Sequence, residues 1–275
     1  MTLAGLVGSA AAGAAATAVA HRLLTHRPPG GHGRWARTNH RGGAVTLLEG
    51  PAVAAGLAAG VLVAPGLPRG VRIGAAVAAL GAGGFGAYDD LAGSGDRRGL
   101  RGHVGALAHG ELTSGAVKIV GIGASGLGAA ALAGRRGTAL VLAGGVVAAT
   151  ANLVNLLDLR PGRALKAGLV LALLDGRHSS DSARLAAVAA GSALVVLPAD
   201  LGERTMLGDA GANALGAVLG LAAVPADAGR LRLAGRLAAL TALTLASEKV
   251  SFTRVIEATP GLREVDRLGR RPPST

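Results

Sequence analysis

Nine runs of apolar residues, separated by short polar loops, constrain the fold of this chain more than any single motif does. The runs consist mainly of Ala, Leu, Val and Gly. A helix needs about 20 mostly apolar residues to cross the hydrocarbon core of a membrane, and several runs approach that length. The runs are Leu3 to Ala20, Ala44 to Ala64, Val71 to Ala87, Gly115 to Ala133, Thr138 to Val154, the shorter Ala164 to Leu174, Leu185 to Ala199, Ala210 to Val224 and Leu231 to Ala246.

The low content of charged residues agrees with this pattern. Charged residues make up 16% of the 275 residues, against about 25% in a typical soluble domain. We therefore expect an all-α polytopic membrane protein, in which residues 1–248 form a bundle of eight or nine transmembrane helices.

The basic residues predict the orientation of that bundle. Nine crossings would place 18 of the 28 Lys and Arg residues on one side and nine on the other, with Lys118 inside a span. Cytoplasmic loops carry the excess of Lys and Arg, so we expect a multi-pass cell-membrane protein with its N-terminus outside and its C-terminus in the cytoplasm. The net charge of +12 is spread through these loops rather than gathered on one soluble domain, so no nucleic-acid partner is expected.

Four carboxylates lie close to predicted helix ends on the predicted cytoplasmic side. They are Asp89, Asp90, Asp158 and Asp209. Acids gathered at the inner membrane interface need a cation nearby. Because the chain has no cysteine, the ligands would be oxygens, which suit Mg²⁺ held by one or two carboxylates together with substrate phosphates. Mn²⁺ is the alternative ion.

Three motifs contain these acids, and in their order they resemble one family. The motifs are "GAYDDLAG" (Gly86 to Gly93), "ANLVNLLD" (Ala151 to Asp158) and "MLGDAGANALG" (Met206 to Gly216). This arrangement resembles the polyprenyl-phosphate sugar-1-phosphate transferases. That family includes phospho-N-acetylmuramoyl-pentapeptide transferase and the transferases that load N-acetylglucosamine-1-phosphate onto undecaprenyl phosphate.

The resemblance implies a function and a set of site residues. The function would be Mg²⁺-dependent transfer of a sugar-1-phosphate from a nucleotide sugar to a polyprenyl phosphate at the inner membrane face, in cell-envelope glycan biosynthesis. Asp209 would hold the ion with one member of the adjacent acidic pair, for which we take Asp90. The catalytic candidates are Asp89, Asp90 and Asp158. The substrate-binding candidates are Asn152, Asn155, Lys118, Arg101 and His103. A second copy of the chain is an open alternative as a further partner.

The sequence also departs from the family pattern. Leu159 and Pro161 stand where the family usually has Gly and a second Asp, and Ala212 replaces a Ser. The family's late cytoplasmic His-rich loop has no counterpart, because the last histidine is His178 on the predicted outer side. A catalytically silent homologue that binds lipid phosphate or scaffolds envelope enzymes is therefore the alternative function.

Each candidate residue also has a purely structural alternative. Asp209 could cap the helix that begins near Ala210, and Asn152 and Asn155 could link helices. Lys118 could extend its ammonium to the inner interface. Glu49 could likewise extend to that interface or pair with Arg41, and Asp158 could pair with Arg160 or Arg163.

Residues 249–275 differ from the rest of the chain. Ser247 to Glu257 is amphipathic, Pro260 and Gly261 interrupt it, and Leu262 to Leu268 forms a second short basic piece. We predict a basic amphipathic cytoplasmic tail that lies along the inner membrane surface.

Overall fold

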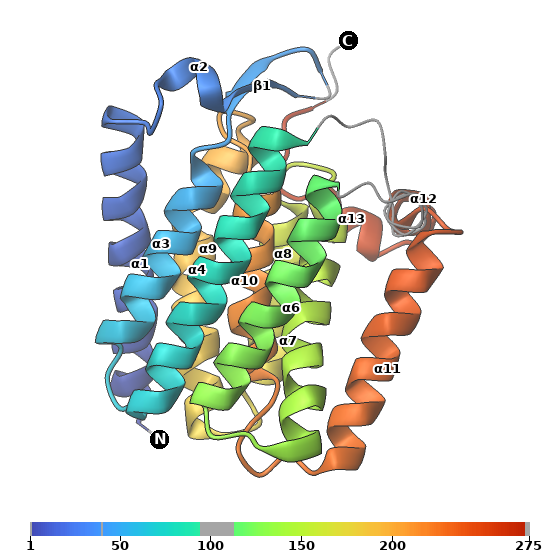
Figure 1. Ribbon diagram of the computed structural model, residues 1–275. Coiled ribbons are helices and arrows are strands. Elements are labelled where there is room, and N and C mark those ends of the chain that lie inside the picture. Colours follow the sequence, from blue (N-terminus) through green and yellow to red (C-terminus); the bar gives the residue numbers. More distant parts are fainter. Residues whose placement is uncertain (1, 40, 94–112, 273–275) are drawn as a thin grey trace.

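The computed structural model describes residues 2–39, 41–93 and 113–272 and is almost entirely helical in these ranges (Figure 1). The candidates Arg101 and His103 lie outside the described residues. Every predicted apolar run contains a helix. These helices are α1 (Leu3–His26), α3 (Glu49–Val63), α4 (Arg69–Ala92), α6 (Ser114–Leu132), α7 (Gly137–Leu157), α8 (Arg163–Asp175), α9 (Ser180–Leu201), α10 (Gly208–Ala222) and α11 (Arg230–Ser247).

The predicted class, an all-α membrane protein, agrees with the structure. Five of the described helices, α1, α4, α6, α7 and α9, are long and apolar enough to cross a membrane. The helices run side by side in one bundle, and α1 begins at the end opposite to α12 (Phe252–Ala258) and α13 (Leu262–Arg267) (Figure 1). The number of crossings and the side on which each end lies stay predictions.

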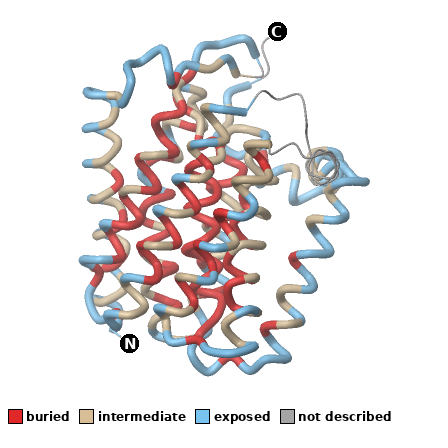
Figure 2. The backbone as a smooth tube through the Cα atoms, in the orientation of Figure 1, coloured by how far each residue is buried: buried red, intermediate tan, exposed pale blue. Residues whose placement is uncertain are grey.

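Helix α10 lies at the centre of the bundle. It contacts α3, α4, α6, α7, α8 and α9, and all of its residues except Asp209 are buried. Figure 2 shows the buried backbone concentrated in these inner helices. An apolar helix that is buried on all sides needs no polar face, so the partly buried acid in its first turn needs a separate explanation.

Glycines allow the inner helices to approach closely. A Cβ atom at Gly86 of α4 would lie 2.4 Å from the carbonyl oxygen of Asp209, and one at Gly216 of α10 would lie 2.6 Å from the Cα of Ala151. Neither backbone could accommodate a larger residue without moving. The small residues of this chain therefore serve close helix packing, which is typical of membrane bundles.

A short hairpin covers the end of the bundle that carries the acids. Strands β1 (Ala36–Thr38) and β2 (Ala44–Thr46) pair antiparallel after the short helix α2 (His32–Trp35). The predicted helix from Ala44 was therefore wrong at its start, because the first residues of that run form β2 and the helix begins only at Glu49. Trp35 packs with Leu47 and Leu48 beneath the hairpin, and the carbonyl of Asp90 accepts a hydrogen bond of 2.6 Å from Arg37. The hairpin thus fixes the end of α4.

The tail is joined to α8 through its polar side. Arg163 donates to both carboxylate oxygens of Asp266, at 2.8 and 3.1 Å, and both residues are buried. Lys166 donates to the carbonyls of Val265, Asp266 and Leu268 at 2.7–3.0 Å. The expected ion pair between Asp158 and Arg163 is therefore wrong.

The apolar side of the tail faces outward. Its exposed side chains are Val250, Val255, Leu262, Val265 and Leu268. An outward apolar face on a segment next to a membrane bundle fits the predicted position along the membrane surface.

The orientation is testable because the chain has no cysteine of its own. We expect a single cysteine in place of Arg230 to react with an impermeant thiol reagent in intact cells. A cysteine in place of Lys249, which is exposed just past the other end of α11, should react only after the cells are opened. Labelling of position 249 in intact cells would invert the predicted topology.

The attachment of the tail should depend on pH. Burial alone would raise the pKa of Asp266, but the hydrogen bonds and charges of Arg163 and Arg270 outweigh it, so the pKa lies below its ordinary value. A lowered carboxyl pKa stabilises the docked tail above the unfolded pKa of about 3.9, and this contribution is lost as the pH falls through the folded pKa. Asp266→Ala should cost about 3 kcal/mol at pH 7 and expose the tail to proteolysis, whereas Glu257→Ala should do neither. Equal digestion of both variants would contradict the docking.

Candidate functional site

A lysine inside the bundle joins two of the four predicted acids. Lys118 lies in the second turn of α6, Asp89 in the last turns of α4 and Asp209 in the first turn of α10. The Lys118 ammonium lies 2.6 Å from Asp89 Oδ2 and also forms a close ion pair with Asp209 Oδ2. The three side chains are 16–28% exposed. We call this group the Lys118 centre.

The side chain of Asp90 accepts backbone amides, whereas that of its neighbour Asp89 pairs with Lys118. Asp90 Oδ1 accepts the amide of Asp209 at 3.1 Å, and Asp90 Oδ2 accepts the amide of Ala210 at 2.9 Å. These amides belong to the first turn of α10, which has no partner for them within its own helix. A carboxylate at this position also interacts favourably with the positive end of the helix dipole. Asp90 therefore caps α10 from α4, and Asp209 is not the cap.

Gly208 explains why a glycine precedes Asp209. Its φ is +62°, a conformation that glycine adopts without strain. A Cβ atom there would also lie 3.1 Å from Asp90 Oδ2 and 2.8 Å from Leu47. The backbone at Gly208 can thus bring the first amides of α10 onto Asp90, and this turn directs Asp209 toward Lys118.

A cavity of 430 Å³ opens beside the Lys118 centre, between α6, α7, α10 and α11. Apolar residues and glycines of α6 and α7 form much of its wall. Its polar lining is Lys118, Asn152, Asn155, Asn213, Thr241, Thr244 and Glu248. Asn213 donates to the carbonyl of Asp209 at 2.7 Å. Three of the sequence-predicted substrate-binding residues therefore line one cavity together with an asparagine that sequence reasoning missed.

The two asparagines of α7 differ in their partners. Asn152 donates to Thr244 of α11 at 3.0 Å, so it does link two helices, as the structural alternative proposed. The side-chain oxygen of Asn155 is buried, and no described residue donates to it. A buried oxygen without a donor is costly unless a ligand or water supplies one. Asn155 is therefore the asparagine placed to contact a ligand in the cavity.

Asp158 lies apart from the Lys118 centre. With Asp200 and Thr205 it lines a second cavity, of 220 Å³, on the other side of Leu207. Burial raises the pKa of Asp158 well above its ordinary value, and the carboxylates of Asp200 and Asp209 raise it further. Asp158 is thus close enough to feel Asp209 electrostatically but is not joined to Lys118.

Two acids near this second cavity were not singled out as site residues. Glu49 is completely buried and accepts a short hydrogen bond from Thr205, while Asp200 accepts the amide of Gly162 at 2.9 Å. The expected pair of Glu49 with Arg41 is wrong, because Arg41 lies 3.2 Å from Glu203 instead. An acid inside an apolar run is a signal for a buried polar site. Glu49 carried it, whereas Asp200 directly follows the run that ends at Ala199.

The acids of the Lys118 centre can be compared with the ligands that a Mg²⁺ site requires. Within the described part of the chain, no group of three His, Asp or Glu side chains is placed to hold a metal ion. Asp89 and Asp209 nevertheless converge on a single cation, the Lys118 ammonium, and two carboxylates are the number that Mg²⁺ takes when substrate phosphates complete its shell. The pair fits the ion in donor type and number. The prediction of Asp90 as a metal ligand stays a prediction, and the contacts favour Asp89.

No protein-family model and no curated protein matches the chain, so comparison with known proteins does not identify its family.

The Lys118 centre can be tested by a double-mutant cycle. Lys118→Met leaves two acids facing each other without their cation, so it should lower the free energy of unfolding by about 3 kcal/mol or more. Adding Asp209→Asn to that variant should restore part of the loss, because the remaining repulsion disappears. Thermal unfolding in neutral detergent measures both effects. Strictly additive losses would mean that the two residues do not interact.

Proposed function

We propose that the chain is a Mg²⁺-dependent transferase that moves a sugar-1-phosphate from a nucleotide sugar to a polyprenyl phosphate at the cytoplasmic face of a membrane. The observation that supports this most is the convergence of Asp89 and Asp209 on one cation position beside a cavity lined by asparagines. Both acids belong to motifs that resemble those of this family. The two motifs are far apart in the chain, since 119 residues separate Asp90 of the first from Asp209 of the second.

The residues of the chain would divide the work as follows. Asp89 and Asp209 would hold the ion in place of the Lys118 ammonium, and Lys118, displaced from between them, would contact phosphate oxygens. Bound Mg²⁺ would neutralise charge on the leaving diphosphate. Asp90 would set the direction of Asp209 through the first turn of α10.

The cavity would hold the substrates in a fixed orientation. Asn155 offers an unused acceptor, and Asn213 links the cavity wall to the backbone of Asp209. The apolar lining from α6 and α7 suits a lipid acceptor that enters from the side of the bundle. Holding two substrates in one geometry accounts for a large part of catalysis in reactions of this kind.

The second candidate is a catalytically silent homologue that binds lipid phosphate. The close pairing of Lys118 with both acids favours it, because a lysine that neutralises Asp89 and Asp209 does not require a metal ion. The missing second Asp and His-rich loop point in the same direction. A screen of purified protein with undecaprenyl phosphate and a panel of nucleotide sugars separates the two candidates. The transferase releases nucleoside monophosphate, and the silent homologue releases none with any donor.

The ion site gives a sharper prediction. Asp209→Asn should abolish turnover and the thermal stabilisation by Mg²⁺, because an amide keeps the shape of the side chain but lacks its charge. Asp227→Asn is the matched control, since Asp227 is 78% exposed and pairs with Arg232 at the other end of the bundle. It should keep both properties. If Mg²⁺ stabilised the parent and Asp209→Asn equally, the ion would not bind at this site.

A further inference from the structure

A third cavity, of 350 Å³, lies where the tail meets the loops of the bundle. Its lining includes five arginines and one acid: Arg41, Arg160, Arg267, Arg270, Arg271 and Glu203. We call it the arginine cavity. It is separate from the Lys118 centre and from the asparagine-lined cavity, since it shares no residue with either.

The walls of the arginine cavity are held by specific contacts between distant segments. Arg41 is paired with Glu203 and donates to the carbonyls of Arg271 and Pro272, at 3.0 and 2.7 Å. Arg270 donates to the carbonyl of Pro161 at 2.9 Å and forms a close ion pair with Asp266. The tail thus closes the cavity against two loops, and its position depends on the Arg163–Asp266 attachment.

The charges of the cavity are not balanced. Glu203 is matched by Arg41, and Asp266, behind the wall, is shared by Arg163 and Arg270. In the described part of the chain, the guanidinium groups of Arg160, Arg267 and Arg271 have neither an acid nor a carbonyl partner. Burial lowers the pKa of Arg270, and the charges of Arg163 and Arg160 lower it further against the opposing effect of Asp266. Arg160 is half-buried, and Arg267 and Arg271 are exposed, so an anion can reach all three guanidinium groups. The excess of positive charge around one hollow favours such an anion.

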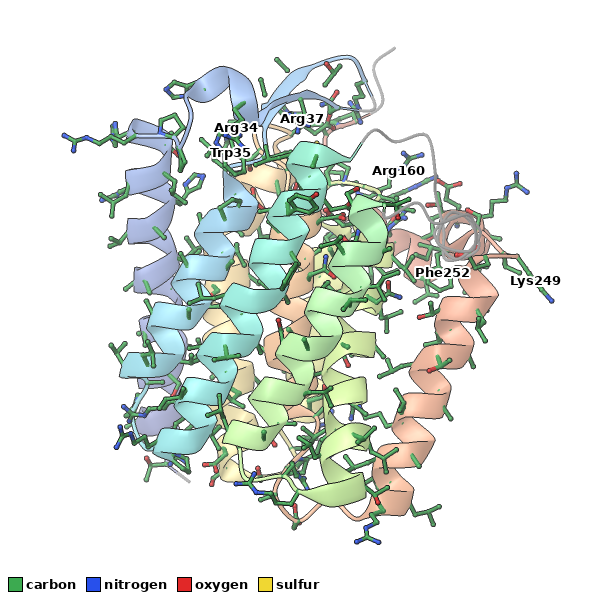
Figure 3. The ribbon with its side chains drawn as sticks, viewed as in Figure 1. Arg34, Trp35, Arg37, Arg160, Lys249 and Phe252 are labelled. Atoms are coloured by element: carbon green, nitrogen blue, oxygen red, sulfur yellow. The ribbon has the colours of Figure 1, made fainter. Side chains whose placement is uncertain are left out.

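We propose that the arginine cavity binds a phosphate-bearing anion, through Arg160, Arg267 and Arg271. Guanidinium groups bind phosphate oxygens in a bidentate manner, and this geometry makes arginine the preferred residue for such ligands. The anion is either a soluble phosphate or the headgroup of an anionic lipid. Figure 3 shows Arg160 toward the same end of the bundle as Arg37. The proposal does not rest on the transferase function, because a silent homologue would have the same cavity.

The test measures the thermal unfolding of the full-length protein in two series, the first in neutral detergent and the second in nanodiscs. Both contain EDTA, so that the Lys118 centre cannot bind phosphate through a metal ion. One series receives inorganic pyrophosphate. The other compares nanodiscs of phosphatidylcholine with nanodiscs that also contain phosphatidylglycerol. We compare the parent, the Arg160→Gln/Arg267→Gln/Arg271→Gln variant and a control with Arg69→Gln/Arg177→Gln/Arg230→Gln, which removes the same charge from the opposite end.

We expect one of the two anions to stabilise the parent and the control variant but not the cavity variant. Half-saturation should require about tenfold more anion, or more, when Arg271→Gln is made alone, since each charge-assisted contact contributes on the order of one factor of ten. This single variant also keeps the test valid if the triple variant folds poorly. Stabilisation by pyrophosphate identifies a soluble ligand, and stabilisation only by phosphatidylglycerol identifies a lipid. Two results would overturn the proposal. In the first, both anions stabilise the cavity variant as much as the parent, and in the second, neither anion stabilises the parent.

Discussion

The contact between the end of α4 and the beginning of α10 determines the rest of the site. Gly86 allows the two backbones to meet, and Asp90 then accepts the first amides of α10. Once that turn is fixed, Asp209 and Asp89 can reach only the same small volume, where α6 supplies Lys118. The hairpin above holds the arrangement through Arg37, which donates to the carbonyl of Asp90.

This contact also explains how the bundle tolerates acids at the end covered by the hairpin. Asp90 is compensated by backbone amides, and Asp89 and Asp209 are compensated by one ammonium. An unpaired buried charge would be expensive, so each of these partners is needed for the fold as well as for a function. With Lys118 between them the two acids keep one net negative charge, whereas the proposed divalent ion in its place would neutralise both.

The sequence predicted the class of fold because long apolar runs and scarce charges leave few alternatives in a membrane. It also placed Asp89 and Asp209 on one face, since alternating helices bring their ends together. It could not show that Asp90 caps α10, because that role depends on how closely α4 packs at Gly86. The partners of Arg163 and Arg41 were missed for a similar reason: Asp266 and Glu203 are distant in the chain, and no local spacing indicates such pairs.

The claim on which this account depends is that Asp89 and Asp209 define one cation position. Electron paramagnetic resonance of free Mn²⁺, titrated into the purified protein, gives the number of bound ions as the difference between total and free Mn²⁺. The account predicts one site in the parent that is lost in Asp89→Asn and in Asp209→Asn and retained in Asp227→Asn. A parent without any site, or acid variants that bind Mn²⁺ as the parent does, would contradict it.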